Sequence, residues 1–122
     1  MNVRDKVKAY LQKCQPCGDQ YVILPEIREE IEGLAMPDDN KEEYKQQRGE
    51  IVAKGKGILP EDGTERQPME FNVGDIVLFQ RYAGNDFWMD EKYVIYPSHE
   101  EQREGLVATK VLRQDSILLR LP

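Results

Sequence analysis

Histidine, cysteine and tryptophan are scarce in this sequence. Its 122 residues include one histidine, two cysteines and one tryptophan. His99 lies in the polar stretch Pro97-Ser98-His99-Glu100-Glu101, with no second histidine or cysteine nearby to share a metal ion. No Ser-His-Asp or Cys-His arrangement can be built around one loop histidine, which we expect to be solvated. The sequence therefore predicts that the protein is not an enzyme and that it binds neither a metal nor a cofactor.

The two cysteines form the motif Cys14-Gln15-Pro16-Cys17. A structural zinc site needs four ligands, and a single chain offers two thiolates here. A thioredoxin-like use needs a following helix, whereas a glycine and a predicted strand follow. We interpret the motif as an incidental thiol pair, with an intermolecular zinc site or redox sensing as the alternatives.

Long apolar runs are also missing. No stretch approaches the eighteen or so apolar residues that span a bilayer, and no apolar segment follows the basic N-terminal residues as in a secretory signal. We therefore expect a cytoplasmic protein without a membrane partner. An organellar address is the alternative for the basic N-terminus, but that segment lacks the Ser and Arg richness of one.

Positive charge is in deficit, with 17 Lys and Arg against 23 Asp and Glu, a net charge of -6. This balance argues against nucleic acid, because binding it requires a cationic surface that neutralises phosphates. The deficit is concentrated in residues 25–47, where eight acidic residues stand against three basic ones, giving -5. Residues 1–13 are basic instead.

The basic N-terminus has the apolar spacing of a short amphipathic helix over residues 3–14. Val3, Val7, Tyr10, Leu11 and Cys14 would share one face, and the lysines would lie on the other. Pro16 and Gly18 follow the predicted end. We expect this helix to pack on its own domain or on a neighbouring subunit; binding to a membrane or another partner is the alternative.

The rest of the chain predicts about seven short strands separated by frequent turns. Asp19–Leu24 is β-branched and aromatic and is stopped by Pro25, and Ile76-Val77-Leu78-Phe79 has the pattern of a core strand buried on both faces. Further strands are expected around residues 49–53 and within 87–96 on either side of a turn at Asp90-Glu91. Near the terminus, Val107, Val111 and Leu112 lead to the apolar run Ile117-Leu118-Leu119. A closed or nearly closed all-β barrel accommodates this pattern in one domain.

Two segments between the strands are unusual. Residues 26–47 are polar, broken by Gly33 and Pro37, and lack a core-facing pattern, which in a compact domain is typical of a functional or disordered loop. Residues 58–70 pass through Pro60-Glu61-Asp62-Gly63, where Asp-Gly is a hairpin turn signal.

Four segments in order resemble the GroES or chaperonin-ten co-chaperonin family. Residues 16–25 (PCGDQYVILP) are similar to its opening strand, and Glu32-Gly33-Leu34-Ala35-Met36-Pro37-Asp38 to its mobile-loop signature. Residues 48–57 (RGEIVAKGKG) resemble a family strand and are the most specific match, and residues 73–79 (VGDIVLF) with Tyr82-Ala83-Gly84 follow at the family spacing. Gln114-Asp115-Ser116-Ile117-Leu118 then resembles the closing strand.

The resemblance implies a GroES-like small β-barrel over residues 16–122, after an N-terminal helical extension over 1–15. It also implies a homo-oligomeric ring, usually a heptamer, that caps a GroEL-type chaperonin while that partner binds and hydrolyses ATP. Gly33, Leu34, Ala35, Met36 and Pro37 in the mobile loop, about 26–47, would contact the chaperonin. Glu61, Asp62 and Gly63 would lie in a roof hairpin, about 58–70.

Two departures mark a divergent member, such as a phage-encoded one acting in the host cytoplasm. The N-terminal helix is extra, and residues 97–111 are expected to be an insertion. Ala35 lacks two or three methyl-sized groups relative to a branched residue, a deficit of about 2 kcal/mol per subunit at about 0.8 kcal/mol per group. The long, adaptable Met36 is expected to compensate.

Other interpretations remain open at this stage. Leu34–Met36 could be an ordinary anchor of the fold. The chain could also be a GroES-fold binding or structural module without a chaperonin partner, with Trp88, Tyr82 and Tyr93 as a stacking platform for nucleic acid or peptide. A fragment of a medium-chain alcohol dehydrogenase is disfavoured, because the chain has no dinucleotide-binding G-x-G-x-x-G motif.

Overall fold

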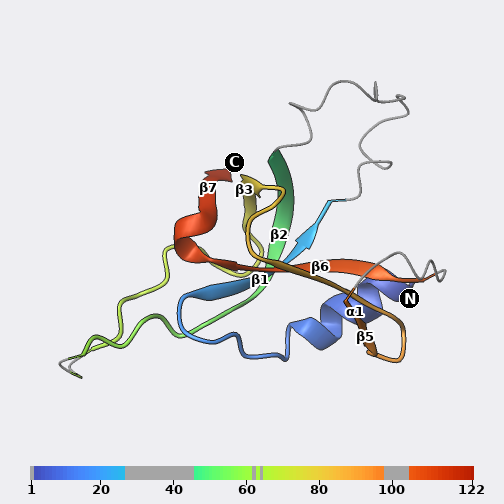
Figure 1. Ribbon diagram of the computed structural model, residues 1–122, viewed down its shortest axis with the longest axis horizontal. Coiled ribbons are helices and arrows are strands. Elements are labelled where there is room, and N and C mark those ends of the chain that lie inside the picture. Colours follow the sequence, from blue (N-terminus) through green and yellow to red (C-terminus); the bar gives the residue numbers. More distant parts are fainter. Residues whose placement is uncertain (1, 27–45, 62, 64, 98–104) are drawn as a thin grey trace.

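The computed structural model describes residues 2–26, 46–61, 63, 65–97 and 105–122. Within these ranges the chain forms one short helix and one seven-stranded antiparallel sheet in the strand order β5-β4-β6-β1-β2-β3-β7 (Figure 1). None of the described helices is long and apolar enough to cross a membrane. The elements are α1 (Val3–Leu11), β1 (Gln20–Pro25), β2 (Gln46–Lys54), β3 (Ile76–Gln80), β4 (Asn85–Met89), β5 (Ile95–Tyr96), β6 (Val107–Arg113), a 3-10 turn (Gln114–Ser116) and β7 (Ile117–Leu121).

The inner core shows that the sheet curls on itself. It joins buried side chains of strands that lie far apart in the strand order, such as Leu112 of β6 and Ile117 of β7. The members of this inner core are Tyr21, Ile23, Ile51, Val77, Phe79, Leu112 and Ile117, with Met69, Phe71 and Ala83 packed against them. A flat sheet would keep β6 and β7 apart, so the fold is a small barrel held together by side chains, and the expected all-β class is confirmed.

A second core lies on the opposite face of β1, beneath α1. Val7 and Leu11 of α1 are buried there with Val22 and Leu24 of β1. A register shift between Val22 and Ile23 opposite β2 marks a bulge, which lets Val52 and Ala53 of β2 both join this core. The helix thus covers one outer face of the barrel wall, so that the side chains on that face are buried.

The burial of the strands corrects one prediction. Ile76–Phe79 in β3 was expected to be buried on both faces, but Val77 and Phe79 are buried whereas Ile76 and Leu78 are half-buried. The strand that is buried throughout is β1, from Tyr21 to Pro25. The reason is α1: the core beneath the helix contains residues of β1, β2, β4 and β6 but none of β3.

The helix is shorter than expected. It was predicted to reach Cys14, but it ends at Leu11, and Lys13 and Cys14 donate to the carbonyls of Tyr10 and Leu11 in a tight turn. Cys14 is therefore exposed and does not share the buried face. At the other end, the Asn2 side chain accepts a bond from the Asp5 amide and caps the first turn.

The connection between β3 and β4 is fixed from inside by a buried lysine. Lys110 of β6 is 1% exposed, and its ammonium donates to the carbonyls of Arg81 and Ala83 at 2.6 and 2.8 Å. It also lies 3.1 Å from an Asp86 carboxylate oxygen and 5.5 Å from the centre of the Phe79 ring. These contacts bring the end of β3 onto β6 and help to close the barrel.

Candidate partner-binding site

The residues expected to contact the chaperonin, Gly33, Leu34, Ala35, Met36 and Pro37, lie outside the described residues, as do Asp62 and His99. The structure describes where the segment 27–45 leaves the sheet and where it returns. Pro25 and Glu26 at the end of β1 lie beside Gln47 and Arg48 near the start of β2, and we call these four residues the loop root.

The loop root is held by backbone and side-chain bonds together. The Glu26 amide donates to the Arg48 carbonyl at 2.9 Å and continues the β1–β2 ladder by one residue. The Arg48 guanidinium lies 2.7 Å from a Glu26 carboxylate oxygen. Gly49, opposite Pro25, has no room for a side chain: a Cβ atom would approach Ile23 Cγ2 to 2.6 Å and the Leu24 carbonyl oxygen to 2.7 Å. The two ends of the segment 27–45 are therefore fixed close together on adjacent strands.

A pocket of about 310 Å³ opens beside the loop root. It is lined by residues from α1, the loop root, β4 and the start of β6: Arg4, Pro25, Glu26, Gln47, Trp88, Leu106, Val107 and Ala108. The pocket combines a largely apolar wall with one cationic and one acidic side chain.

The segment 58–70, expected to form the roof hairpin, projects away from the sheet at the lower left of Figure 1. The described residues between β2 and β3 form no strand, and the two arms are linked by the Gln67 amide bond to the Ile58 carbonyl and the Arg66 guanidinium bond to the Gly57 carbonyl, both 2.9 Å. Gly57 has φ 98° and lies against the Gln67 carbonyl, where a Cβ atom would overlap it. Near the tip, the Gly63 amide donates to the Pro60 carbonyl, and Glu61 is exposed.

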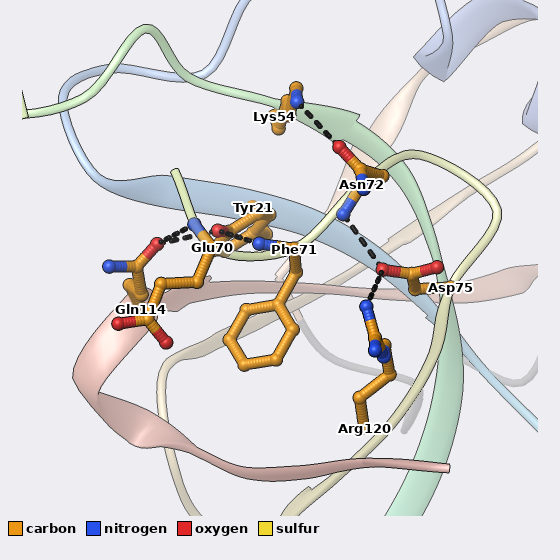
Figure 2. A network of polar contacts seen from close by, with 8 residues as sticks. All are labelled: Tyr21, Lys54, Glu70, Phe71, Asn72, Asp75, Gln114 and Arg120. Carbon is orange, nitrogen blue, oxygen red and sulfur yellow. Dashed lines mark hydrogen bonds and ion pairs between the residues drawn. The ribbon is translucent and has the colours of Figure 1, made fainter. Parts of the chain in front are cut away.

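A polar network fixes the returning arm of this projection to the barrel (Figure 2). The Tyr21 hydroxyl donates to Gln114 Oε1 at 2.7 Å and accepts from the Phe71 amide at 3.1 Å, while the Glu70 amide donates to the same Gln114 oxygen at 2.8 Å. Tyr21 comes from β1 and Gln114 from the turn before β7, so one hydroxyl joins three distant parts of the chain.

The network continues toward the start of β3. The Asn72 amide donates to an Asp75 carboxylate oxygen at 2.9 Å, and the Lys54 ammonium donates to Asn72 Oδ1 at 3.1 Å. Arg120 of β7 lies 3.9 Å from the same Asp75 oxygen, as Figure 2 shows. The turn before β3 is thereby tied to β2 and β7.

Burial raises the pKa of the Tyr21 phenol above its usual value of about 10, and the carboxylates of Glu70 and Asp19 act in the same direction. The hydrogen bond from the Phe71 amide opposes this shift. The folded protein thus favours the neutral phenol, which its role as a donor to Gln114 requires.

Replacing Tyr21 by phenylalanine should lower the free energy of unfolding at neutral pH by about 1–2 kcal/mol, because the partly buried Phe71 amide loses its acceptor and Gln114 loses a donor. Since the folded pKa is raised, the contribution of the neutral phenol is complete below about pH 10 and is lost as the pH rises above it. Denaturant unfolding between pH 7 and 11 tests this. The fall in stability above pH 10 should be shallower in Tyr21→Phe, and an identical pH profile would contradict the assignment.

Among the other described residues singled out in the sequence, Trp88 lies beside the loop root, in the pocket that Pro25, Glu26 and Gln47 also line. Cys14 and Cys17 are exposed free thiols, and the described part of the chain holds no group of three or more His, Cys, Asp and Glu residues able to bind a metal ion. Of the three aromatics weighed as a stacking platform, Tyr82 is exposed in the turn after β3, Trp88 lines the pocket, and Tyr93 stacks on Tyr10 of α1 with ring centres 4.2 Å apart.

Three residues with long-range contacts received no structural role from the sequence reasoning: Arg4 at the loop root, Gln114 in the polar network and Lys110 inside the barrel. Arg4 and Gln114 have no local signal, because their partners are 21 and 93 residues away. Lys110 did have a local signal, because it interrupts the apolar pattern of Val107–Leu112 at a position that a strand would bury. The expected insertion 97–111 includes this strand: residues 107–111 belong to β6 and pair with β4 and β1.

A family model described as "Chaperonin 10 Kd subunit" matches residues 13–101. The curated protein "Co-chaperonin GroES" of Coprothermobacter proteolyticus is 42% identical over 84 residues, which cover 66% of this chain and 83% of the relative. Proteins of the same name are 38% identical over 94 residues in Elusimicrobium minutum, covering 75% and 92%, and 41% identical over 85 residues in Thermus thermophilus, covering 66% and 80%. The matched range begins after α1 and includes the loop root and the projection.

Proposed function

Since this chain belongs to the chaperonin 10 kDa subunit family, we propose that it is a co-chaperonin: a ring-forming cap that binds a GroEL-type chaperonin in the cytoplasm. The cap closes the folding chamber while the partner binds and hydrolyses ATP. The cap itself performs no chemistry and needs no cofactor. Gly33-Leu34-Ala35-Met36-Pro37 contacts the chaperonin, and the projection 58–70 with Glu61, Asp62 and Gly63 forms the roof of the chamber.

The loop root is the observation that carries this proposal. Residues 27–45 leave and return on adjacent antiparallel strands, and their two ends are held by the Glu26–Arg48 bonds. A segment of this length can therefore reach a partner without disturbing the barrel. Fixing each loop residue costs roughly 1–2 kcal/mol, so a few buried apolar side chains give a weak contact per subunit.

A ring supplies the avidity that one weak contact lacks. The strand β7 lies at the end of the strand order with β3 as its neighbour, and Leu118 and Leu119 on it are 46% and 45% exposed. An edge strand with exposed leucines suits pairing with another copy of this chain. Repetition around a heptamer then allows firm capping while each contact remains releasable.

Particle mass and chaperonin binding test the proposal together. Light scattering should give the mass of seven 14.2 kDa chains, and the particle should co-migrate with a GroEL-type chaperonin in size-exclusion chromatography when ATP is present and separate when it is absent. A strict monomer that never co-migrates would overturn the proposal. A ring of another size that still co-migrates would correct the subunit number and leave the capping role intact.

A further inference from the structure

The helix α1 lies outside the range matched by the family model, yet it is firmly attached to the barrel. Its own side chains Val7 and Leu11 are buried against the sheet, and the Lys8 ammonium lies 2.9 Å from a Glu50 carboxylate oxygen on β2. At its other end Tyr10 stacks on Tyr93. A helix held along its length in this way is a rigid support for whatever its first turn contacts.

The first turn of α1 contacts the loop root. A terminal nitrogen of the Arg4 guanidinium donates to the Pro25 carbonyl at 2.9 Å, across 21 residues of sequence. Because Glu26 donates toward β2, the carbonyl of its neighbour Pro25 points to the other side of β1, where β6 runs. The β1–β6 ladder ends at Ile23 and Lys110, so this carbonyl lies beyond the last strand pair.

Proline explains why the ladder cannot continue. Pro25 has no N–H to donate toward β6, so β1 and β6 separate at this point. The pocket of about 310 Å³ lies at this point, with Pro25 and Ala108 among its lining residues. On the β2 side the loop root is held by Arg48, and on the β6 side Arg4 supplies the donor that a strand would otherwise provide.

We propose that Arg4 is a positioning residue for partner binding: α1 uses its guanidinium to fix the direction in which the chaperonin-binding segment leaves the barrel. This inference deepens the proposed function and rests on it for the identity of the partner. A hydrogen bond from a charged donor is stronger than one from a neutral donor. A fixed root limits the freedom of the residues next to it, so fewer conformations at the start of the segment remain to be excluded when the partner binds.

Arg4→Met is the decisive variant, because it removes the donors and keeps an unbranched apolar stem. Lys6→Met is the matched control: it makes the same charge change on the same helix, and Lys6 lies 3.9 Å from Glu91, away from the loop root. Arg4→Lys retains the charge with a different donor geometry and should restore part of the effect. Amide hydrogen exchange of the protein alone and the dissociation constant for the chaperonin with ATP are measured for all three.

In Arg4→Met, exchange of the Glu26 amide should accelerate roughly tenfold, and the dissociation constant should rise about tenfold or more, because each subunit of the ring is affected. The amides of Val7 and Leu11 should exchange as in the unmodified protein. Lys6→Met should change none of these quantities. An unchanged Glu26 amide in Arg4→Met, or equal weakening by Lys6→Met, would overturn the proposal.

Two further outcomes are also decisive. If Arg4→Met accelerates amide exchange at Val7 and Leu11, the experiment is repeated with Arg4→Gln. If both variants loosen the helix, Arg4 supports α1 and not the loop root. That result also overturns the proposal. If the unmodified protein does not bind the chaperonin, the proposed function fails. The exchange of Glu26 then still shows whether Arg4 holds the root.

Discussion

Replacing Leu34 and Met36 together by serine should abolish capping of the chaperonin and leave the free energy of unfolding of the barrel within about 0.5 kcal/mol of its original value. Burial of each side chain in an apolar groove contributes about 1.5–3 kcal/mol. The loss recurs in every subunit of the ring, so the avidity falls steeply. ATP-dependent co-migration with the chaperonin and thermal unfolding measure the two effects separately.

Ile31→Ser is a suitable control for this experiment, because it removes an apolar side chain from the same segment outside the predicted contact Gly33–Pro37. Capping should survive in this control. Persistent capping in the double variant would refute the assignment of the contact residues. A large loss of stability in the double variant would instead identify Leu34 and Met36 as anchors of the fold.

Replacing Lys110 by methionine should lower the free energy of unfolding by about 2–4 kcal/mol, even though the new side chain has a similar length. The carbonyls of Arg81 and Ala83 lose their donor at 2.6 and 2.8 Å, and the Asp86 carboxylate loses its cation. The contact that joins the turn after β3 to β6 is lost with them. Chemical denaturation at constant pH measures the change.

Asp86→Asn is the matched control for this second prediction, since it removes the opposite charge and leaves both carbonyl bonds in place. The side chain of Asp86 is 48% exposed, so the ion pair is largely screened and its loss should cost less than about 1 kcal/mol. If Lys110→Met proved as stable as the original protein, apolar packing would compensate for the lost bonds at this site. The buried lysine would then not be a structural requirement.

Local patterns predicted the strands well. Among the described residues, β1, β2, β3, β4, β5 and β7 occur near the expected residues, because alternation and turn signals act over a few neighbours. The helix ends three residues early, and most of β6 lies within the expected insertion 97–111. The turn around Asp90 between β4 and β5 is one example: its carboxylate accepts from the amides of Lys92 and Val94. The bond from the Val94 amide is the main reason that the pKa of Asp90 is lowered.

Burial on the second face of a strand was not predictable in the same way. The sequence of β3 is as apolar as that of β1, but β1 is covered by α1 and β3 is not. Which strand a helix covers depends on packing between distant segments, such as the shared core of Val7, Val22 and Val52. These contacts leave no trace in the local sequence of either strand.

The sequence by itself determined the fold class, the order of the strands along the chain, the acidic character of residues 25–47 and the family resemblance. All of these depend on the type and spacing of nearby residues. The tertiary structure decided that β1 is the central buried strand, that Lys110 closes the barrel from inside, and that Arg4 contacts the loop root. Each of these depends on a side chain meeting a strand or a backbone carbonyl many residues away: apolar side chains of α1 on β1, and the cationic side chains of Lys110 and Arg4 on carbonyls. Only the folded chain brings such partners together.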